Sequence, residues 1–150
     1  MQPYLASMER IKISLPDHFS FSTLIPIRIT DINYGNHVGN DTFLSLIHEA
    51  RMQFLGQHNY TELQFAGVGL IMADVAIEFK RELVYGDTVK VHVTATAFDK
   101  LGFDIFYKIT VEKDGIETIA GKAKTGMICY DYTLKKKVNI PEEALEKLNR

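Results

Sequence analysis

The chain has 150 residues, of which 46% are hydrophobic and 24% are charged, enough for one folded domain and too few for two ordinary ones. Its 17 basic and 19 acidic residues give a net charge of -2, which does not favour nucleic acid or an anionic membrane as a partner. The single cysteine, Cys129, excludes an intramolecular disulfide and a CxxC metal site, and it fits a reducing compartment such as the cytoplasm.

Residues 1–15 mix Glu9, Arg10 and Lys12 with short apolar pieces, so no secretory signal is expected there. The longest apolar stretch, residues 65–73, ends at Asp74 and is less than half of a membrane span. We therefore expect a soluble cytoplasmic protein that forms a single domain over residues 1–150, with its core at about 19–131.

Alternating hydrophobic positions predict a first strand over residues 19–29. Pro26 lies inside this strand and cannot donate a ladder hydrogen bond, so the strand is expected at an edge of the sheet or with a bulge. Residues 31–41 read DINYGNHVGND and predict a loop, because Asn, Asp and Gly favour turns. Turn chemistry alone explains this composition, and a binding site at the start of a helix explains it equally well.

A largely buried helix is predicted after the loop, with Asn40 or Asp41 as its N-cap and Gly56 at its end. Apolar residues recur through this segment at three- and four-residue steps, and they cover nearly half of the helix circumference. They are Phe43, Leu44, Leu46, Ile47, Ala50, Phe54 and Leu55.

Four more strands are predicted after the helix. The first begins at Ile71 and places Ile71, Ala73, Val75, Ile77 and Phe79 on one side, with Asp74, Glu78 and Lys80 on the other. The next two cover residues 89–97 and 103–111, and the last covers about 116–131 after an Asp-Gly hairpin signal.

Residues 141–150 predict a short helix that packs weakly. The order of these elements, one strand, a long helix and then four strands joined by tight turns, indicates an α+β fold. We expect one long central helix wrapped by a curved five-stranded antiparallel sheet.

The pattern Asp31-x-Asn33-x-x-x-His37-Val38-x-Asn40, followed by Glu49-Ala50-Arg51, resembles the signature of hot-dog-fold acyl-CoA thioesterases of the 4-hydroxybenzoyl-CoA thioesterase family. The usual form is D-x-D-x-x-G-H-V-N-N before a helix that bears E-A-R. The resemblance extends more loosely over residues 24–131. It implies a hot-dog fold and hydrolysis of an acyl-CoA or acyl carrier protein thioester by a homodimer or homotetramer, without a metal or redox cofactor.

Three positions depart from that signature: Asn33 stands where the family carries its second Asp, Asn36 replaces a Gly, and Gly39 replaces the first Asn of the N-N pair. The second Asp is commonly the catalytic carboxylate in this family. An amide takes up no proton at neutral pH, so Asn33 cannot be the general base. A similar D-x-N-x-H-V-N-N motif in plant-type acyl-ACP thioesterases, two residues shorter in its spacing, implies that Asn33 and His37 belong to the catalytic set.

Hydrolysis of a thioester needs a base for water, and three carboxylates lie close to this loop in the sequence. Asp41, at the helix start, is expected to serve as a cap. Asp31 either activates water or pins the loop, and it is a candidate partner for Arg51, which lies inside the apolar stripe. Glu49 lies on the polar side of the helix, where the resemblance implies an active site between the loop of one chain and the helix of its partner. We therefore expect Glu49, or failing it Asp31, as the base.

The remaining roles are assigned around the start of the helix. Asn33 and His37 are expected to orient the thioester, while backbone amides near Asn40 and Asp41 receive the oxyanion. An apolar tunnel for the acyl group is expected between helix and sheet, lined by Phe54, Leu55, Ile71 and Met72.

Two other interpretations stay open. One is a non-catalytic acyl-CoA binding protein of the same fold, since Asn33 replaces the usual catalytic Asp. The other is a hot-dog dehydratase, which is less favoured because the segment lacks the His and Asp pattern that resembles those enzymes.

Overall fold

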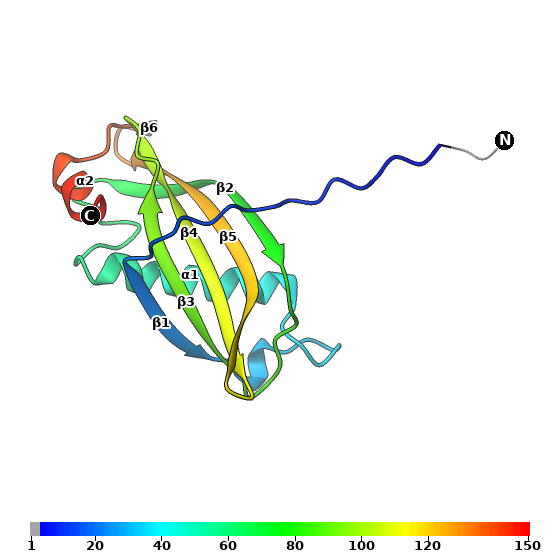
Figure 1. Ribbon diagram of the computed structural model, residues 1–150. Coiled ribbons are helices and arrows are strands. Elements are labelled where there is room, and N and C mark those ends of the chain that lie inside the picture. The colour runs from blue at the N-terminus through cyan, green and yellow to red at the C-terminus, as the bar shows by residue number, and fades with distance from the viewer. Residues whose placement is uncertain (1–3) are drawn as a thin grey trace.

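The computed structural model describes residues 4–150. No secretory signal is predicted for residues 1–15, and the first three of these residues lie outside the described part of the chain. One antiparallel sheet curves around the helix α1 (Asn40–Gly56), which lies against one of its faces (Figure 1). In spatial order the sheet contains β1 (Phe21–Pro26), β3 (Thr88–Thr96), β4 (Gly102–Lys113), β5 (Ile116–Asp131) and β2 (Gly69–Phe79). The predicted order of elements is confirmed, with two additions: a short 3-10 helix lies between β1 and α1, and a sixth strand, β6 (Lys136–Lys137), pairs with β5.

The core lies between α1 and the inner face of the sheet. Ile47 and Ala50 of α1 are fully buried, as are Val91 of β3 and Ala123 of β5. Successive strand residues point to opposite faces, so the alternating apolar positions of β3 and β4 seen in the sequence reach the helix side. None of the helices within residues 4–150 has the length and apolar character to cross a membrane.

β1 lies at an edge of the sheet, as Pro26 predicts, and Pro26 is paired with Thr88 at the end of the β1–β3 register. The strand is shorter than the predicted 19–29, and a 3-10 helix, η1 (Ile29–Asp31), follows it after residues 27 and 28. The carboxylate of Asp31 accepts a hydrogen bond from the backbone N–H of Arg28 at 2.8 Å and so bends the chain out of the sheet.

β2 forms the opposite edge and contains a bulge between Met72 and Asp74. The bulge reverses the alternation that the sequence predicts for Ile71. Ile71 is paired with Ile128 on the outer face, whereas Met72 is paired with the buried Met127 on the helix side. A residue inserted into one strand shifts every earlier side chain to the other face, which the spacing alone did not indicate.

The helix α2 (Glu142–Leu148) packs more firmly than expected. Ala144 and Leu148, one turn apart on the same side, are both buried in the core cluster. Lys147 Nζ lies over the ring of Tyr60, 5.2 Å from its centroid. The prediction of weak packing was wrong because this short apolar stripe meets the far end of the core.

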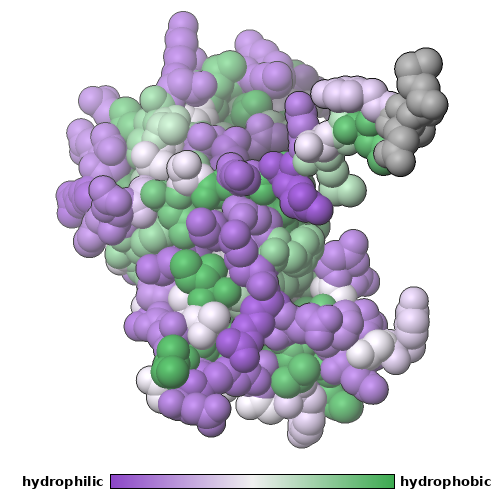
Figure 2. Space-filling model, turned by 45° about the vertical axis from the view of Figure 1, so that its right-hand side comes forward, coloured by the Kyte–Doolittle hydropathy of each residue, from purple (hydrophilic) through white to green (hydrophobic). Residues whose placement is uncertain are grey.

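The segment before β1 crosses the outer face of the sheet toward β2 (Figure 1). Lys108 Nζ lies 5.3 Å from the ring centroid of Phe19, and the backbone N–H of Ile13 donates to Glu78 Oε1 at 2.9 Å. On the N-terminal side of Ile13 the chain projects away from the sheet (Figure 1). Figure 2 shows apolar side chains among polar ones along this segment. Tyr4 and Leu5 are almost fully exposed there.

Candidate active site

The loop between η1 and α1 folds back on itself as a tight turn. The backbone N–H of Asn33 donates to the carbonyl of His37 at 3.0 Å, and that of Asn36 donates to the carbonyl of Asn33 at 3.0 Å. Asn36 adopts a left-handed backbone with φ of 65°, a conformation that Asn tolerates better than most residues. The backbone N–H of Val38 donates to Leu83 at 2.8 Å and ties the turn to the segment after β2.

This turn fixes the orientation of the Asn33 side chain. Asn33 Oδ1 accepts a hydrogen bond from the N–H of Gly35 at 2.8 Å. A Cβ added at Gly35 would lie 3.2 Å from Asn33 Oδ1 and 3.3 Å from His37 Nε2, so both side chains border this glycine. On the other side, Asn33 Nδ2 borders Gly39, where an added Cβ would lie 3.1 Å away. The amide therefore directs its oxygen toward Gly35 and its N–H donors toward the start of α1.

A groove of about 460 Å³, the loop groove, lies between this turn, the start of α1 and the end of β2. Phe43 and Phe79 meet edge to face in it, with ring centroids 5.2 Å apart. His37 Nε2 lies 3.6 Å from Glu82 Oε1 at the rim. The groove is lined by Asn33, His37, Val38, Gly39, Asn40, Phe43, Phe79, Lys80, Arg81, Glu82 and Leu83.

The start of α1 differs from the prediction. Gly39 is the N-cap, without a side-chain cap, so neither Asn40 nor Asp41 has the capping role expected for it. The helix begins at Asn40, whose Oδ1 accepts a hydrogen bond from the N–H of Asp41 at 3.0 Å. Asp41 thus belongs to the first helical turn. Its carboxylate oxygen Oδ1 lies beside Gly39, where an added Cβ would be 2.8 Å from it.

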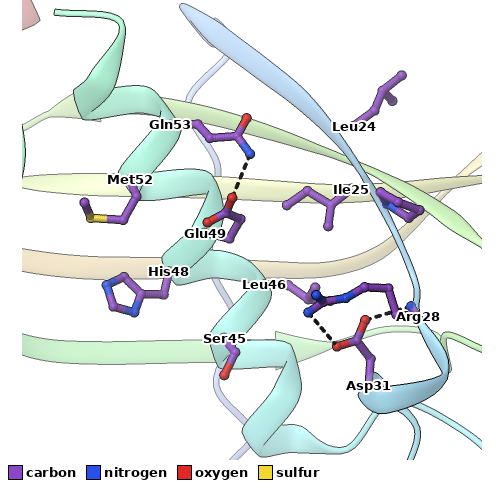
Figure 3. Close-up of a pocket in the computed structure, with 11 residues that line it drawn as sticks. Leu24, Ile25, Arg28, Asp31, Ser45, Leu46, His48, Glu49, Met52 and Gln53 are labelled. Atoms are coloured by element: carbon purple, nitrogen blue, oxygen red, sulfur yellow. Dashed lines mark hydrogen bonds and ion pairs between the residues drawn. The ribbon is translucent and has the colours of Figure 1, made fainter. Parts of the chain in front are cut away.

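A second groove of about 550 Å³, the helix groove, lies between the exposed side of α1 and β1 (Figure 3). Glu49 borders it, and its Oε1 accepts a hydrogen bond from Gln53 Nε2 at 3.1 Å. The Gln53 Oε1 in turn accepts from the Thr23 hydroxyl at 2.5 Å. Glu49 therefore points away from the core, as its place on the polar side of the helix predicts.

Asp31 also borders the helix groove, but its carboxylate is engaged locally. It is 7% exposed, accepts from the N–H of Arg28, and lies 3.4 Å from Arg28 Nη2. The expected pair with Arg51 does not form. Arg51 instead donates from Nε to Glu62 Oε1 at 3.2 Å and from Nη1 to the Tyr107 hydroxyl at 3.2 Å. Glu62 follows the helix in a loop without periodicity, so spacing could not identify it as the partner.

The structure thus divides the predicted site residues between two places. Asn33, His37 and Asn40 line the loop groove, with Asp41 beside it, whereas Asp31 and Glu49 line the helix groove. Phe54 lies in the core at 1% exposure and Met72 lies on the β2 edge, so neither lines either groove.

Other residues of the loop groove were missed. Residues 79–83, which run from the last residue of β2 onward, form one of its walls, and their only signal in the sequence was their position at a strand end. Within residues 4–150, no three His, Cys, Asp or Glu side chains converge as a set that could hold a metal ion. The side chains that line the loop groove provide amide, imidazole, carboxylate and aromatic groups.

Residues 27–148 match the family model described as the thioesterase-like superfamily. The chain belongs to this superfamily. A 1,4-dihydroxy-2-naphthoyl-CoA hydrolase from Microcystis aeruginosa is 30% identical over 102 residues, which cover 66% of this chain and 71% of that protein. Together, the superfamily match and this relative confirm the predicted enzyme class, a thioester hydrolase.

Solved structures agree on the fold of this thioesterase-superfamily chain. A 1,4-dihydroxy-2-naphthoyl-CoA thioesterase from Synechocystis superposes with a TM-score of 0.75 at 20% identity, covering 87% of this chain and 98% of the other. A mutant 4-hydroxybenzoyl CoA thioesterase complexed with 4-hydroxybenzoyl CoA gives a TM-score of 0.77 at 11% identity, covering 85% and 97%. The predicted hot-dog fold is therefore confirmed.

Proposed function

We propose that this protein hydrolyses the thioester of an acyl-CoA or acyl carrier protein in the loop groove, releasing a carboxylic acid and a thiol. One observation carries the proposal. In a chain of the thioesterase-like superfamily, the turn aims the Asn33 amide donors at the start of α1, in a groove that His37 and the Phe43–Phe79 pair also line.

Each of these groups has a part in the proposed reaction. Asn33 Nδ2 and the first-turn amides of α1, other than that of Asp41, which donates to Asn40 Oδ1, donate to the carbonyl oxygen as it becomes an oxyanion. His37, at 35% side-chain exposure, orients the thioester from the rim. The rings of Phe43 and Phe79 contact the apolar part of the acyl group.

The proposed reaction also needs a carboxylate close to the loop groove to activate water. Glu49 lies in the helix groove, so it acts on the loop groove only if a second copy brings its own α1 there. Asp31 is held by Arg28 and pins the loop. Asp41 belongs to the same chain as the loop groove, and its Oδ1 lies beside Gly39, which lines that groove.

A second copy is also part of the proposal, as a homodimer or homotetramer joined through the β2 edge. An edge strand leaves backbone donors and acceptors unpaired and pairs readily with another strand. Met72, Val75 and Phe79 of β2 are 42%, 41% and 54% exposed, which is a large apolar surface for a single strand. We place this assembly in the cytoplasm, where the buried thiol of Cys129 stays reduced.

Thiol release tests the proposed function. Wild type, Asn33→Ala and His37→Ala are each given short, medium, long and aromatic acyl-CoAs, and the best acyl group is then offered on acyl carrier protein. Asn139→Ala, an exposed amide outside both grooves, is the control. We expect wild-type turnover with at least one acyl group and a loss of ~100-fold in kcat for Asn33→Ala.

Asn33 stands where the family usually carries a carboxylate, and this favours a second candidate function, that of an acyl-CoA binding protein without turnover. Equilibrium binding of the same acyl-CoAs separates the two. Saturable binding by wild type together with no thiol release would support the binding protein and contradict the proposed hydrolase.

A further inference from the structure

Asp41 holds a carboxylate that the fold itself does not use. It does not cap α1, and within residues 4–150 its side chain makes no hydrogen bond or ion pair. The side chain is exposed at the start of the helix, where the positive end of the helix dipole favours a negative charge. Helix capping therefore does not explain why a carboxylate is present at this position.

The position of this carboxylate relates it directly to Asn33. Both groups border the small space above the Cα of Gly39: an added Cβ there would lie 2.8 Å from Asp41 Oδ1 and 3.1 Å from Asn33 Nδ2. Among the described residues neither Asn33 Nδ2 nor the Asp41 carboxylate has a hydrogen-bond partner, so an amide donor lies on one side of this space and an acceptor on the other. Gly39 and Asn33 also line the loop groove, so a molecule in the groove reaches both.

The other carboxylates near the groove are less suited to act there. Asp31 is engaged by Arg28, and Glu49 lies in the helix groove with Gln53. Glu82 lies on the rim at 75% side-chain exposure, beside His37 and not beside the Asn33 donors. Asp41 is the carboxylate that faces Asn33 across Gly39.

We propose that Asp41 is the catalytic base of the loop groove, acting on water while Asn33 binds the carbonyl oxygen; this inference rests on the proposed thioester hydrolysis. The water oxygen forms a bond to the carbonyl carbon as its proton passes to the Asp41 carboxylate. The carbonyl oxygen becomes an oxyanion that accepts from Asn33 Nδ2. Its collapse breaks the C–S bond, and the departing thiolate takes the proton from Asp41, which restores the carboxylate.

This assignment accounts for two departures from the family signature together. The carboxylate that the family carries at the position of Asn33 is replaced by one at Asp41, on the opposite side of Gly39. An Asn at position 39, the usual residue, would fill the space through which the two groups face each other. The Asn33 and Asp41 side chains thus form one unit across Gly39, in which the carboxylate stands opposite the position where the family carries it.

The test compares single carboxylate-to-amide variants on the best acyl-CoA, measured by thiol release. Asp41→Asn is expected to lower kcat by ~100-fold or more with little change in KM, because the lost proton acceptor acts in the transition state. Asp114→Asn, an exposed carboxylate outside both grooves, is the matched control and is expected within about threefold of wild type, while Glu49→Gln tests the alternative base. Circular dichroism and thermal melting verify that each variant is folded.

A rescue variant tests the geometry separately from the fold. In Asn33→Asp combined with Asp41→Asn, the carboxylate and amide are exchanged across Gly39, and we expect at least ~10-fold more turnover than in Asp41→Asn alone. Full turnover by Asp41→Asn, or a collapse in Glu49→Gln instead, would overturn the role of Asp41 and leave the hydrolase intact. No turnover by wild type would overturn the proposed function and this inference with it.

Discussion

Arg51 Nη1 donates to the hydroxyl of Tyr107 at 3.2 Å in the buried layer between α1 and β4. The Tyr107 hydroxyl also lies 2.8 Å from Thr125 Oγ1, and Glu62 Oε1 accepts from Arg51 Nε and lies 2.8 Å from His48 Nε2. Burial alone would lower the pKa of Arg51, but Tyr107 and Glu62 outweigh it and raise that pKa. The guanidinium thus stays charged inside the protein because this network surrounds it.

Removing the Glu62 carboxylate should therefore destabilise the protein. In Glu62→Ala the Arg51 charge, 4% exposed, loses its anionic partner. We expect a loss of about 2 kcal/mol in the free energy of unfolding, below the 3–5 kcal/mol of fully buried pairs because Glu62 is partly exposed. Urea unfolding measures it, with Glu143→Ala, from the exposed pair with Lys147, as the control. Equal unfolding midpoints for the two variants would contradict this account.

For Arg51, the sequence predicted the burial of the side chain correctly but not its partner. The apolar periodicity placed Arg51 inside the buried stripe, which is correct, because a period of 3.6 residues determines a helix face. Its partner was sought in Asp31, near in sequence and negatively charged. In the structure the partner of Arg51 is Glu62, which lies in the loop after the helix. No local sequence pattern predicts where that loop brings Glu62.

The candidate site was predictable to a similar extent. Composition and resemblance selected the loop around Asn33 and His37, and turn chemistry holds it as expected. Glu49 lies away from this loop, as its place on the polar side of the helix predicts. The role of Gly39 as N-cap, which frees Asp41, was not predictable, since Gly, Asn and Asp all suit the start of a helix.

The close approach at Gly39 can be tested by a single methyl group. Gly39 has φ of -74°, which Ala also adopts, so Gly39→Ala should fold normally. Its Cβ would displace Asp41 Oδ1 and Asn33 Nδ2, and we expect kcat to fall by ~10-fold or more, because displacement of catalytic groups by about 1 Å is costly.

Gly56→Ala is the matched control, since nothing lies within 4 Å of a Cβ there. It should retain full turnover and gain about 0.5–1 kcal/mol in the free energy of unfolding, because Ala is the better helix former. Steady-state thiol release and urea unfolding of both variants provide the comparison. Unchanged kcat in Gly39→Ala would show that the space above this residue is not used in the reaction.

The two edges of the sheet allow a matched test of assembly. Val75 lies on the helix side of β2 and Leu24 on β1, and they are 41% and 65% exposed. Val75→Lys should dissociate the proposed oligomer, because a buried lysine without a partner would interrupt the paired β2 edges. Sedimentation velocity over a concentration series measures this effect. Leu24→Lys should leave assembly intact, and the opposite outcome would move the interface to β1.

The buried thiol of Cys129 provides a pH-dependent prediction. Burial, with a smaller effect of Asp99, raises the pKa of Cys129 from 9.0 to about 11. The unfolded chain therefore loses this proton at lower pH than the folded chain, and the contribution to stability is complete below pH 9 and declines as the pH rises toward about 11. The decline should amount to about 2–3 kcal/mol in the free energy of unfolding.

Cys129→Ala should lose this part of the pH dependence, while the lysines and tyrosines titrate equally in both proteins. Urea unfolding of wild type and variant at pH 8, 9, 10 and 11 isolates the difference, because comparison of the two curves cancels every other group. Parallel curves would mean that the thiol titrates alike in the folded and unfolded chains. In that case Cys129 should also react rapidly with a disulfide reagent in the folded protein at pH 8, whereas a buried thiol should react only after urea is added.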